Sequence, residues 1–212
     1  MVGISQKWLP SSAMILVTEP TTGKILAYAA RPSFDPVQYA KEKDLSVFLN
    51  PAVEKQYELG SALKPITMAA ALEERVVSPF TTYRDDGEAR IGGYTIKNFD
   101  GKAYGTQTMT QVIERSLNTG MVFVARELGK DRHLDYLKKF GFGERTGIDL
   151  PGEVMGDISN LSHGRDIDFA TASFGQGIAI TPLQLAMGIG VFANGGKLMT
   201  PYIVERMTQD TG

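Results

Sequence analysis

The sequence predicts an α+β fold, in which a pair of strands opens the chain and several helices follow. Residues 13–30, "AMILVTEPTTGKILAYAA", form two apolar runs around Pro20-Thr21-Thr22-Gly23, a turn signal typical of a β-hairpin. Farther along, apolar residues recur at helical spacing between helix start and stop signals. No repeat or low-complexity linker divides the 212 residues, so a single domain is expected.

The amino-acid composition argues against several classes of function. The chain is 42% hydrophobic and 22% charged, which is typical of a globular protein, and its net charge of −2 gives no electrostatic reason to expect nucleic acid as a partner. The absence of cysteine excludes disulfides and thiolate catalysis. His133 and His163 stand in no ligand-spaced cluster, so neither a metal nor another cofactor is expected. No stretch approaches the ~18 consecutive apolar residues of a membrane span.

The first expected helix covers residues 61–77, "SALKPITMAAALEERVV". Pro65 fits in its first turn, because the N–H groups there have no intrahelical partners. The spacing of its apolar residues predicts four buried positions, Leu63, Ile66, Ala70 and Leu72.

Two later helices begin with a capping box, in which a threonine is followed three residues later by a glutamine. One spans residues 108–130 and is interrupted at residues 116–120, and the other runs from residue 181 to a stop at Asn194-Gly195. A short helix is expected over residues 131–140. Two strand segments complete the pattern, a hairpin within residues 89–99 and a closing strand, "YIVERM", at residues 202–207.

Ser61 and Lys64 are the first candidate functional pair. Residues three apart lie on the same face of a helix, so the serine hydroxyl and the lysine amine should lie side by side. The pair can be a nucleophile with its base, or an ordinary helix start with a capping serine and a solvated lysine. Taken alone, the Ser-x-x-Lys pattern favours the helix start, because it occurs often by chance.

A second pair changes this assessment. Ser116 and Asn118 lie two residues apart in "RSLNTG", at the expected helix interruption. Ser-x-x-Lys followed by Ser-x-Asn is the signature of penicillin-binding proteins and serine β-lactamases. Further segments resemble class B penicillin-binding proteins and come in that family's order: "TEPTTGKILAYAARPSFDP", "YELGSALKPITMAAAL", "FGFGERTGIDLPGE" and "ASFGQGIAITPLQLA".

The resemblance implies a fold and an activity. The fold would be that of the serine β-lactamases and penicillin-binding transpeptidases, an antiparallel sheet with a helical subdomain, present as a partial transpeptidase domain over residues 1–212. The activity would be that of a peptidoglycan D,D-transpeptidase. In that mechanism Ser61 attacks the D-Ala-D-Ala carbonyl of a stem peptide to form an acyl-enzyme, Ser116 relays a proton toward the leaving amine, and Asn118 holds the substrate amide.

The residue types suit this chemistry. A serine hydroxyl is a poor nucleophile until a neighbouring group takes its proton, and no histidine is placed to do so, which leaves Lys64 as the candidate base. A free lysine has a pKa of about 10.4 and is protonated at neutral pH. Burial and a second cation nearby would lower the pKa of Lys64.

The resemblance also implies partners and a location. Peptidoglycan stem peptides would be the substrates, and β-lactam antibiotics, which resemble the D-Ala-D-Ala dipeptide, would acylate the same serine. In the full-length protein, a membrane glycosyltransferase and the cell-division or elongation machinery are expected partners, at the extracytoplasmic face of the bacterial cell membrane. The membrane anchor would lie outside this chain, and no cofactor and no nucleic acid are implied.

A third family motif, Lys-Ser/Thr-Gly, has no match in this chain. Its only candidate is "QDTG" at residues 209–212, with aspartate where the cation belongs. We therefore expect the chain to end before the last part of its domain, including the C-terminal strands of the sheet. The motif would supply a substrate-binding cation and one oxyanion N–H group, and loss of one such donor typically lowers the rate by about 10²–10³.

This chain alone is accordingly expected to be a weak or inactive transpeptidase, although all four candidate residues are present. The measurement is the rate of penicillin acylation for this chain and for a version extended through a downstream Lys-Thr-Gly. Equal rates would show that the 212 residues suffice.

Two other functions stay open on the sequence. A β-lactamase or D,D-carboxypeptidase would use water as the acceptor, and no deacylating group can be identified. A non-catalytic sensor or scaffold that binds β-lactams or wall fragments is favoured by the absent third motif. Acylation by a fluorescent penicillin, followed by the rate of label loss, separates the three functions.

Overall fold

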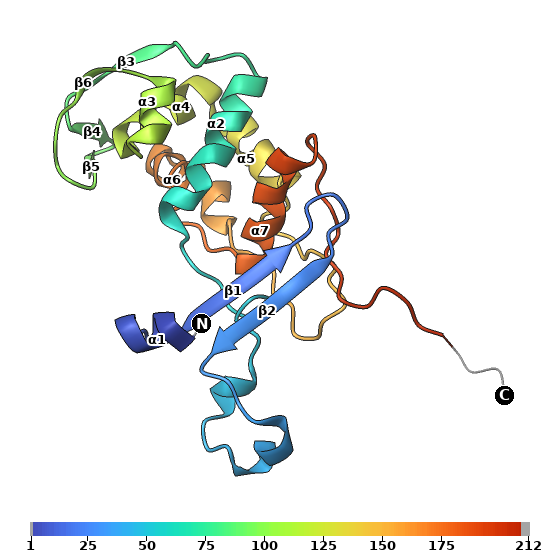
Figure 1. Cartoon of the computed structure of the whole chain (residues 1–212). Coiled ribbons are helices and arrows are strands. Elements are labelled where there is room, and N and C mark those ends of the chain that lie inside the picture. Colours follow the sequence, from blue (N-terminus) through green and yellow to red (C-terminus); the bar gives the residue numbers. More distant parts are fainter. Residues whose placement is uncertain (1, 209–212) are drawn as a thin grey trace. The chain divides into compact units, whose positions relative to one another are not determined.

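The computed structural model describes residues 2–208, so the "QDTG" candidate at residues 209–212 lies outside the described residues. The chain divides into two compact units, which are described separately. The hairpin unit comprises residues 1–56, 144–155 and 181–212, and the helical unit comprises residues 57–143 and 156–180. Helices and antiparallel strands are both present, as the predicted α+β class requires (Figure 1). The single domain over residues 1–212 stays a prediction.

The hairpin unit contains α1 (Val2–Trp8), β1 (Ala13–Thr18), β2 (Ile25–Arg31), α7 (Pro182–Gly190) and the 3₁₀ helices η1 (Pro36–Lys41), η2 (Leu45–Phe48) and η5 (Val191–Ala193). The first two strands form the expected antiparallel hairpin, with Ala13 opposite Arg31. α7 starts with the expected capping box, in which the Gln184 N–H donates to the Thr181 hydroxyl at 3.1 Å. The buried apolar residues of this unit are Ala52, Val53, Ile148, Leu183 and Met187.

The closing strand expected at residues 202–207 is wrong. Only Tyr202 forms a β-bridge, to Lys24, and the residues after it are irregular. The backbone N–H groups of Ile203 and Val204 instead donate to the Asp149 carboxylate, at 2.9 and 2.7 Å. A carboxylate that takes two successive N–H groups competes with the regular ladder of a strand.

The helical unit contains η3 (Gly60–Leu63), α2 (Lys64–Glu73), β3 (Thr82–Asp85), β4 (Glu88–Ile91), β5 (Tyr94–Lys97), β6 (Gly105–Thr108), α3 (Met109–Glu114), α4 (Asn118–Leu128), α5 (Lys130–Lys139), η4 (Ser159–His163) and α6 (Asp166–Ala172). α2 contacts α4 and α5, and α4 also contacts α6 (Figure 1). Along residues 2–208, no helix is long and apolar enough to cross a membrane.

The helix expected over residues 61–77 is shorter in the structure. Its first turn is the 3₁₀ helix η3, and α2 ends before Arg75, which takes the left-handed conformation at φ +55°. Pro65 lies in the first turn of α2 as expected. Three of the four predicted positions are buried, but Leu72 is 37% exposed, because two residues after the buried Ala70 it points to the opposite side of the helix.

The remaining elements largely follow the sequence. The hairpin expected within residues 89–99 is present as β4 and β5, joined by Gly92-Gly93 with positive φ at both residues, as a tight hairpin turn requires. The helix break is shorter than expected and covers only residues 115–117. Gly120 lies inside α4, where a Cβ would come within 2.6 Å of the Val112 side chain on α3.

Candidate active site

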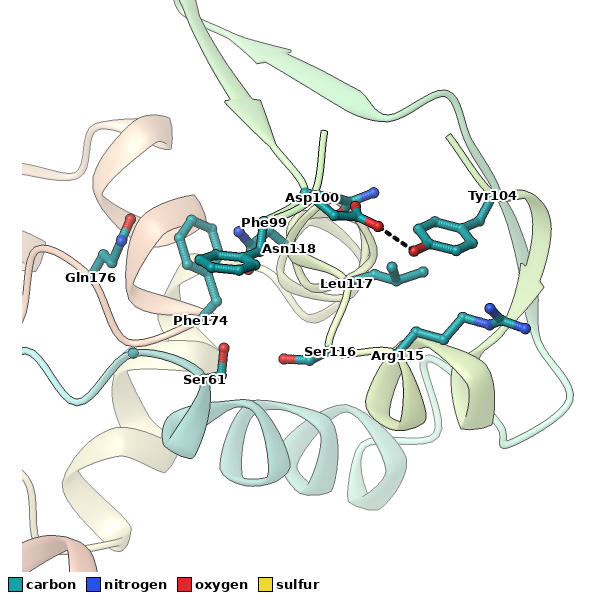
Figure 2. Close-up of a pocket in the computed structure, with 12 residues that line it drawn as sticks. Ser61, Phe99, Asp100, Tyr104, Arg115, Ser116, Leu117, Asn118, Phe174 and Gln176 are labelled. Atoms are coloured by element: carbon teal, nitrogen blue, oxygen red, sulfur yellow. Dashed lines mark hydrogen bonds between the residues drawn. The ribbon is translucent and has the colours of Figure 1, made fainter. Parts of the chain in front are cut away.

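A pocket of about 470 Å³ in the helical unit brings together three of the four predicted site residues. Ser61, Ser116 and Asn118 all line it. Figure 2 shows the Ser61 and Ser116 hydroxyls pointing into the same space, one from η3 and the other from the loop between α3 and α4. Residues 55 positions apart, counted from 61 to 116, therefore share one site.

Lys64, the fourth predicted residue, does not line the pocket and is only 2% exposed. Its Nζ donates to the Ser116 carbonyl at 2.5 Å and to the Ser116 Oγ at 2.9 Å. It follows Ser61 by three residues across a 3₁₀ turn, and side chains at that spacing in a 3₁₀ helix lie one above the other. In the part of the chain that the structure describes, no hydrogen bond joins the Ser61 hydroxyl to either residue, as in many unliganded enzymes.

Burial sets the protonation of Lys64. Removal from water disfavours the charged form and lowers the pKa of Lys64 to about 8. Among the described residues burial is the cause, and the second cation expected from the sequence does not contribute. A lysine with this pKa is neutral in about one molecule in ten at pH 7, so it can accept a proton near neutral pH.

The backbone at Ser116 is left-handed, with φ +55°. A residue with a side chain seldom takes this conformation, and such residues are common at functional sites. The turn is held by hydrogen bonds from the Ser116 N–H to the Ile113 carbonyl at 3.1 Å and from the Leu117 N–H to the Val112 carbonyl at 3.0 Å. The conformation directs both the hydroxyl and the carbonyl of Ser116 toward the Lys64 amine.

A buried polar network fixes the start of α4, which carries Asn118. The Asn118 side-chain amide donates to the Lys97 carbonyl at 3.0 Å. The next residue, Thr119, donates from its hydroxyl to the Asp85 carboxylate at 2.8 Å, and Asn98 donates to the same carboxylate at 2.9 Å. Asp85 is only 1% exposed, so its charge is stabilised by these donors. Sequence analysis did not identify Asp85 or Asn98 as part of the site.

The "SFGQG" segment, residues 173–177, supports the turn that carries Ser61. The Gly60 N–H donates to the Gly175 carbonyl at 3.0 Å, and nearby Tyr57 and Ile180 exchange two backbone hydrogen bonds of 3.0 Å each. Gly175 has φ +77°, and a Cβ there would overlap the Gly60 carbonyl oxygen. Glycine is therefore required at position 175 by both conformation and space.

Comparison with known proteins identifies the family of this chain. The family model described as "Penicillin binding protein transpeptidase domain" matches residues 13–211. The chain belongs to this family.

Relatives of this penicillin-binding transpeptidase domain include two curated proteins. Stage V sporulation protein D of Bacillus subtilis (strain 168) is 39% identical over 201 residues, which are 94% of this chain and 31% of that protein. Penicillin-binding protein PbpB of Mycobacterium tuberculosis is 32% identical over 197 residues, 93% of this chain and 29% of that protein. The chain thus spans less than a third of the length of each of these relatives.

Two solved structures share the fold of this chain. Penicillin binding protein 3 from Mycobacterium tuberculosis, complexed with aztreonam, superposes with a TM-score of 0.89 at 30% identity, covering 98% of this chain and 46% of that chain. A peptidoglycan glycosyltransferase from Burkholderia ambifaria superposes with a TM-score of 0.84 at 24% identity, covering 100% of this chain and 61% of that chain. The predicted α+β transpeptidase fold is confirmed.

Replacing Gly175 by alanine in this transpeptidase domain is expected to destabilise the helical unit by about 2–4 kcal/mol, from the left-handed conformation and the overlap with Gly60. Because the overlap displaces the Ser61 turn, penicillin acylation should also slow by about 10–10²-fold. Urea unfolding and the labelling rate measure the two effects. Gly164→Ala is the matched control, since its φ is +68° but nothing lies within 4 Å of the added Cβ. Equal losses in both variants would contradict the close contact between Gly175 and Gly60.

Proposed function

We propose that this chain carries the nucleophile of a peptidoglycan D,D-transpeptidase, that Ser61 forms the acyl-enzyme, and that β-lactams acylate the same residue. The observation that supports this most is the state of Lys64. It is buried, burial lowers its pKa to about 8, and its Nζ lies 2.9 Å from the hydroxyl of Ser116, which shares a pocket with Ser61.

Ser61, Lys64 and Ser116 account for every bond and proton that the proposed reaction moves on the enzyme. Neutral Lys64 takes the Ser61 hydroxyl proton while the Ser61 oxygen bonds to the carbonyl carbon of the penultimate D-alanine. The C–N bond then breaks, and Ser116 passes the proton from the Lys64 ammonium to the departing D-alanine amine. An amine of a second stem peptide attacks the ester, a new amide bond forms, and Ser61 regains its proton.

Asn118 positions the donor peptide. Its amide nitrogen is engaged by the Lys97 carbonyl, which fixes the orientation of the side chain. Its Oδ1 accepts no hydrogen bond from the residues that the structure describes, and Asn118 lines the pocket that also holds Ser61. A substrate N–H is the complementary group.

We also propose the substrates, the location and the partners of the whole protein. Stem peptides are the substrates, and the reaction takes place at the extracytoplasmic face of the bacterial cell membrane, beside a membrane glycosyltransferase and the division or elongation machinery. Among residues 2–208, no group of three metal-ligating side chains could hold a metal ion, and the mechanism above uses none.

The pH dependence follows from the lowered pKa of Lys64. The base is its neutral form, so the acylation rate should rise about tenfold per pH unit below pH 8 and level off above it. Labelling rates with a fluorescent penicillin from about pH 6 to about pH 9 measure the profile. A rate that does not change across this range would contradict the role of Lys64 as base.

Three outcomes of one experiment separate the candidate functions. A version of the chain extended through a downstream Lys-Thr-Gly is labelled with a fluorescent penicillin, and label loss and transfer from a D-Ala-D-Ala peptide to an added amine are then followed. Stable label with transfer supports the transpeptidase, and rapid loss to water indicates a β-lactamase or D,D-carboxypeptidase. Stable label without transfer indicates a sensor or scaffold, and the absence of label would contradict the proposal.

A further inference from the structure

The end of the pocket away from Ser61 holds a cluster that the mechanism does not use. Asp100, Tyr104 and Arg115 line the same pocket as Ser61. Figure 2 shows Tyr104 and Arg115 together at this end, with Asp100 reaching toward the Tyr104 hydroxyl. Arg115 directly precedes Ser116, so its position in the chain is tied to the left-handed turn of the site.

Tyr104 is held firmly in place. Its hydroxyl donates to the Asp100 carboxylate at 2.5 Å, and its backbone N–H donates to the buried Asp85 carboxylate at 3.1 Å. The Lys102 N–H donates to the other oxygen of Asp100 at 3.1 Å. Tyr104 is therefore anchored to the same network that fixes the start of α4 at Asn118.

Arg115 lies against this ring, with its guanidinium carbon 5.2 Å from the ring centroid of Tyr104. A cation–π contact of this kind holds the guanidinium beside the ring and leaves its N–H groups available. Among the described residues, no carboxylate or carbonyl accepts a hydrogen bond from the Arg115 side chain, and it forms no ion pair. Asp100, the acidic residue of the lining, already accepts from Tyr104 and from the Lys102 N–H.

We propose that Arg115 is a specificity-determining residue that binds a carboxylate on the donor peptide, upstream of its D-Ala-D-Ala end. An oriented guanidinium with unused donors is the side chain best suited to a planar anion, which it binds through two parallel hydrogen bonds. The pocket therefore selects donors that carry an acidic side chain over otherwise identical neutral donors. The inference rests on the proposed function, because it assumes that a D-Ala-D-Ala peptide occupies this pocket.

The test measures equilibrium binding of two synthetic peptides to a Ser61→Ala variant, which cannot be acylated. Both peptides end in D-Ala-D-Ala and differ only in the preceding residue, whose side chain ends in a carboxylate or in a carboxamide. The carboxylate peptide should bind about 10-fold tighter, and this preference should shrink as salt is raised. Adding Arg115→Gln should remove the preference, whereas Arg115→Lys should retain part of it.

Arg90→Gln is the matched control, because Arg90 is an exposed arginine of the same unit that does not line this pocket. It should leave the preference unchanged. Equal binding of the two peptides, or a preference that survives Arg115→Gln, would overturn the inference even where wild-type Ser61 is acylated by penicillin. Failure of both peptides to bind also overturns it, and only the additional absence of Ser61 acylation would count against the proposed function itself.

Discussion

Replacing Ser61 by alanine is expected to abolish covalent labelling of the chain by a fluorescent penicillin. The acyl-enzyme is an ester of the Ser61 oxygen, and alanine has no oxygen to form it. Ser61 is exposed in the pocket, so its loss should change the free energy of unfolding by no more than about 0.5 kcal/mol. Gel fluorescence after a long incubation measures labelling, and urea unfolding measures stability.

Ser162→Ala is the control for this experiment. Ser162 is also an exposed serine of the helical unit, and its hydroxyl donates to the Ser159 carbonyl at 2.6 Å, outside the pocket. The control should be labelled like the wild type. Labelling of Ser61→Ala at the wild-type rate would show that another residue is the nucleophile.

Replacing Lys64 by methionine should slow acylation by about 10²–10⁴-fold, the range typical of a positioned general base. Methionine has a similar length and carries no charge, so it can fill the buried space without the desolvation that lowers the lysine pKa. The folded state should therefore persist. The residual rate should also lose its rise toward pH 8, a change that a purely structural defect would not produce.

Lys138→Met provides the comparison, because Lys138 is exposed on α5. Its acylation rate and pH profile should match those of the wild type. If Lys64→Met keeps both the wild-type rate and the wild-type pH profile, Lys64 is not the base.

The local parts of the site could be predicted from the sequence. Ser61 and Lys64 are three residues apart, and a single helical turn is enough to place them on one face. The meeting of Lys64 with Ser116 spans 52 residues. Spacing alone cannot predict such a contact, and it was expected only through the resemblance to a family.

The buried network and the C-terminal segment could not be predicted, and the reason is the same for both. Asp85 and Thr119 are 34 residues apart, and polar residues in a loop look alike whether they are solvated or buried. Residues 202–207 have the composition of a strand, but a carboxylate 54 residues away, Asp149, takes the Ile203 N–H group. Long-range hydrogen bonds of this kind leave no periodic signal in the chain.

The most direct test of Ser61 as nucleophile is the position of a β-lactam adduct within the chain. Trypsin cleaves after Lys55 and Arg75 but not between Lys64 and Pro65, so Ser61 falls in the peptide of residues 56–75, where it is the only serine. Cleavage after Arg115 places Ser116 in a separate peptide, residues 116–126. Tandem mass spectrometry of the labelled digest should find the adduct on Ser61. An adduct on Ser116, with none in the peptide of residues 56–75, would contradict the assignment.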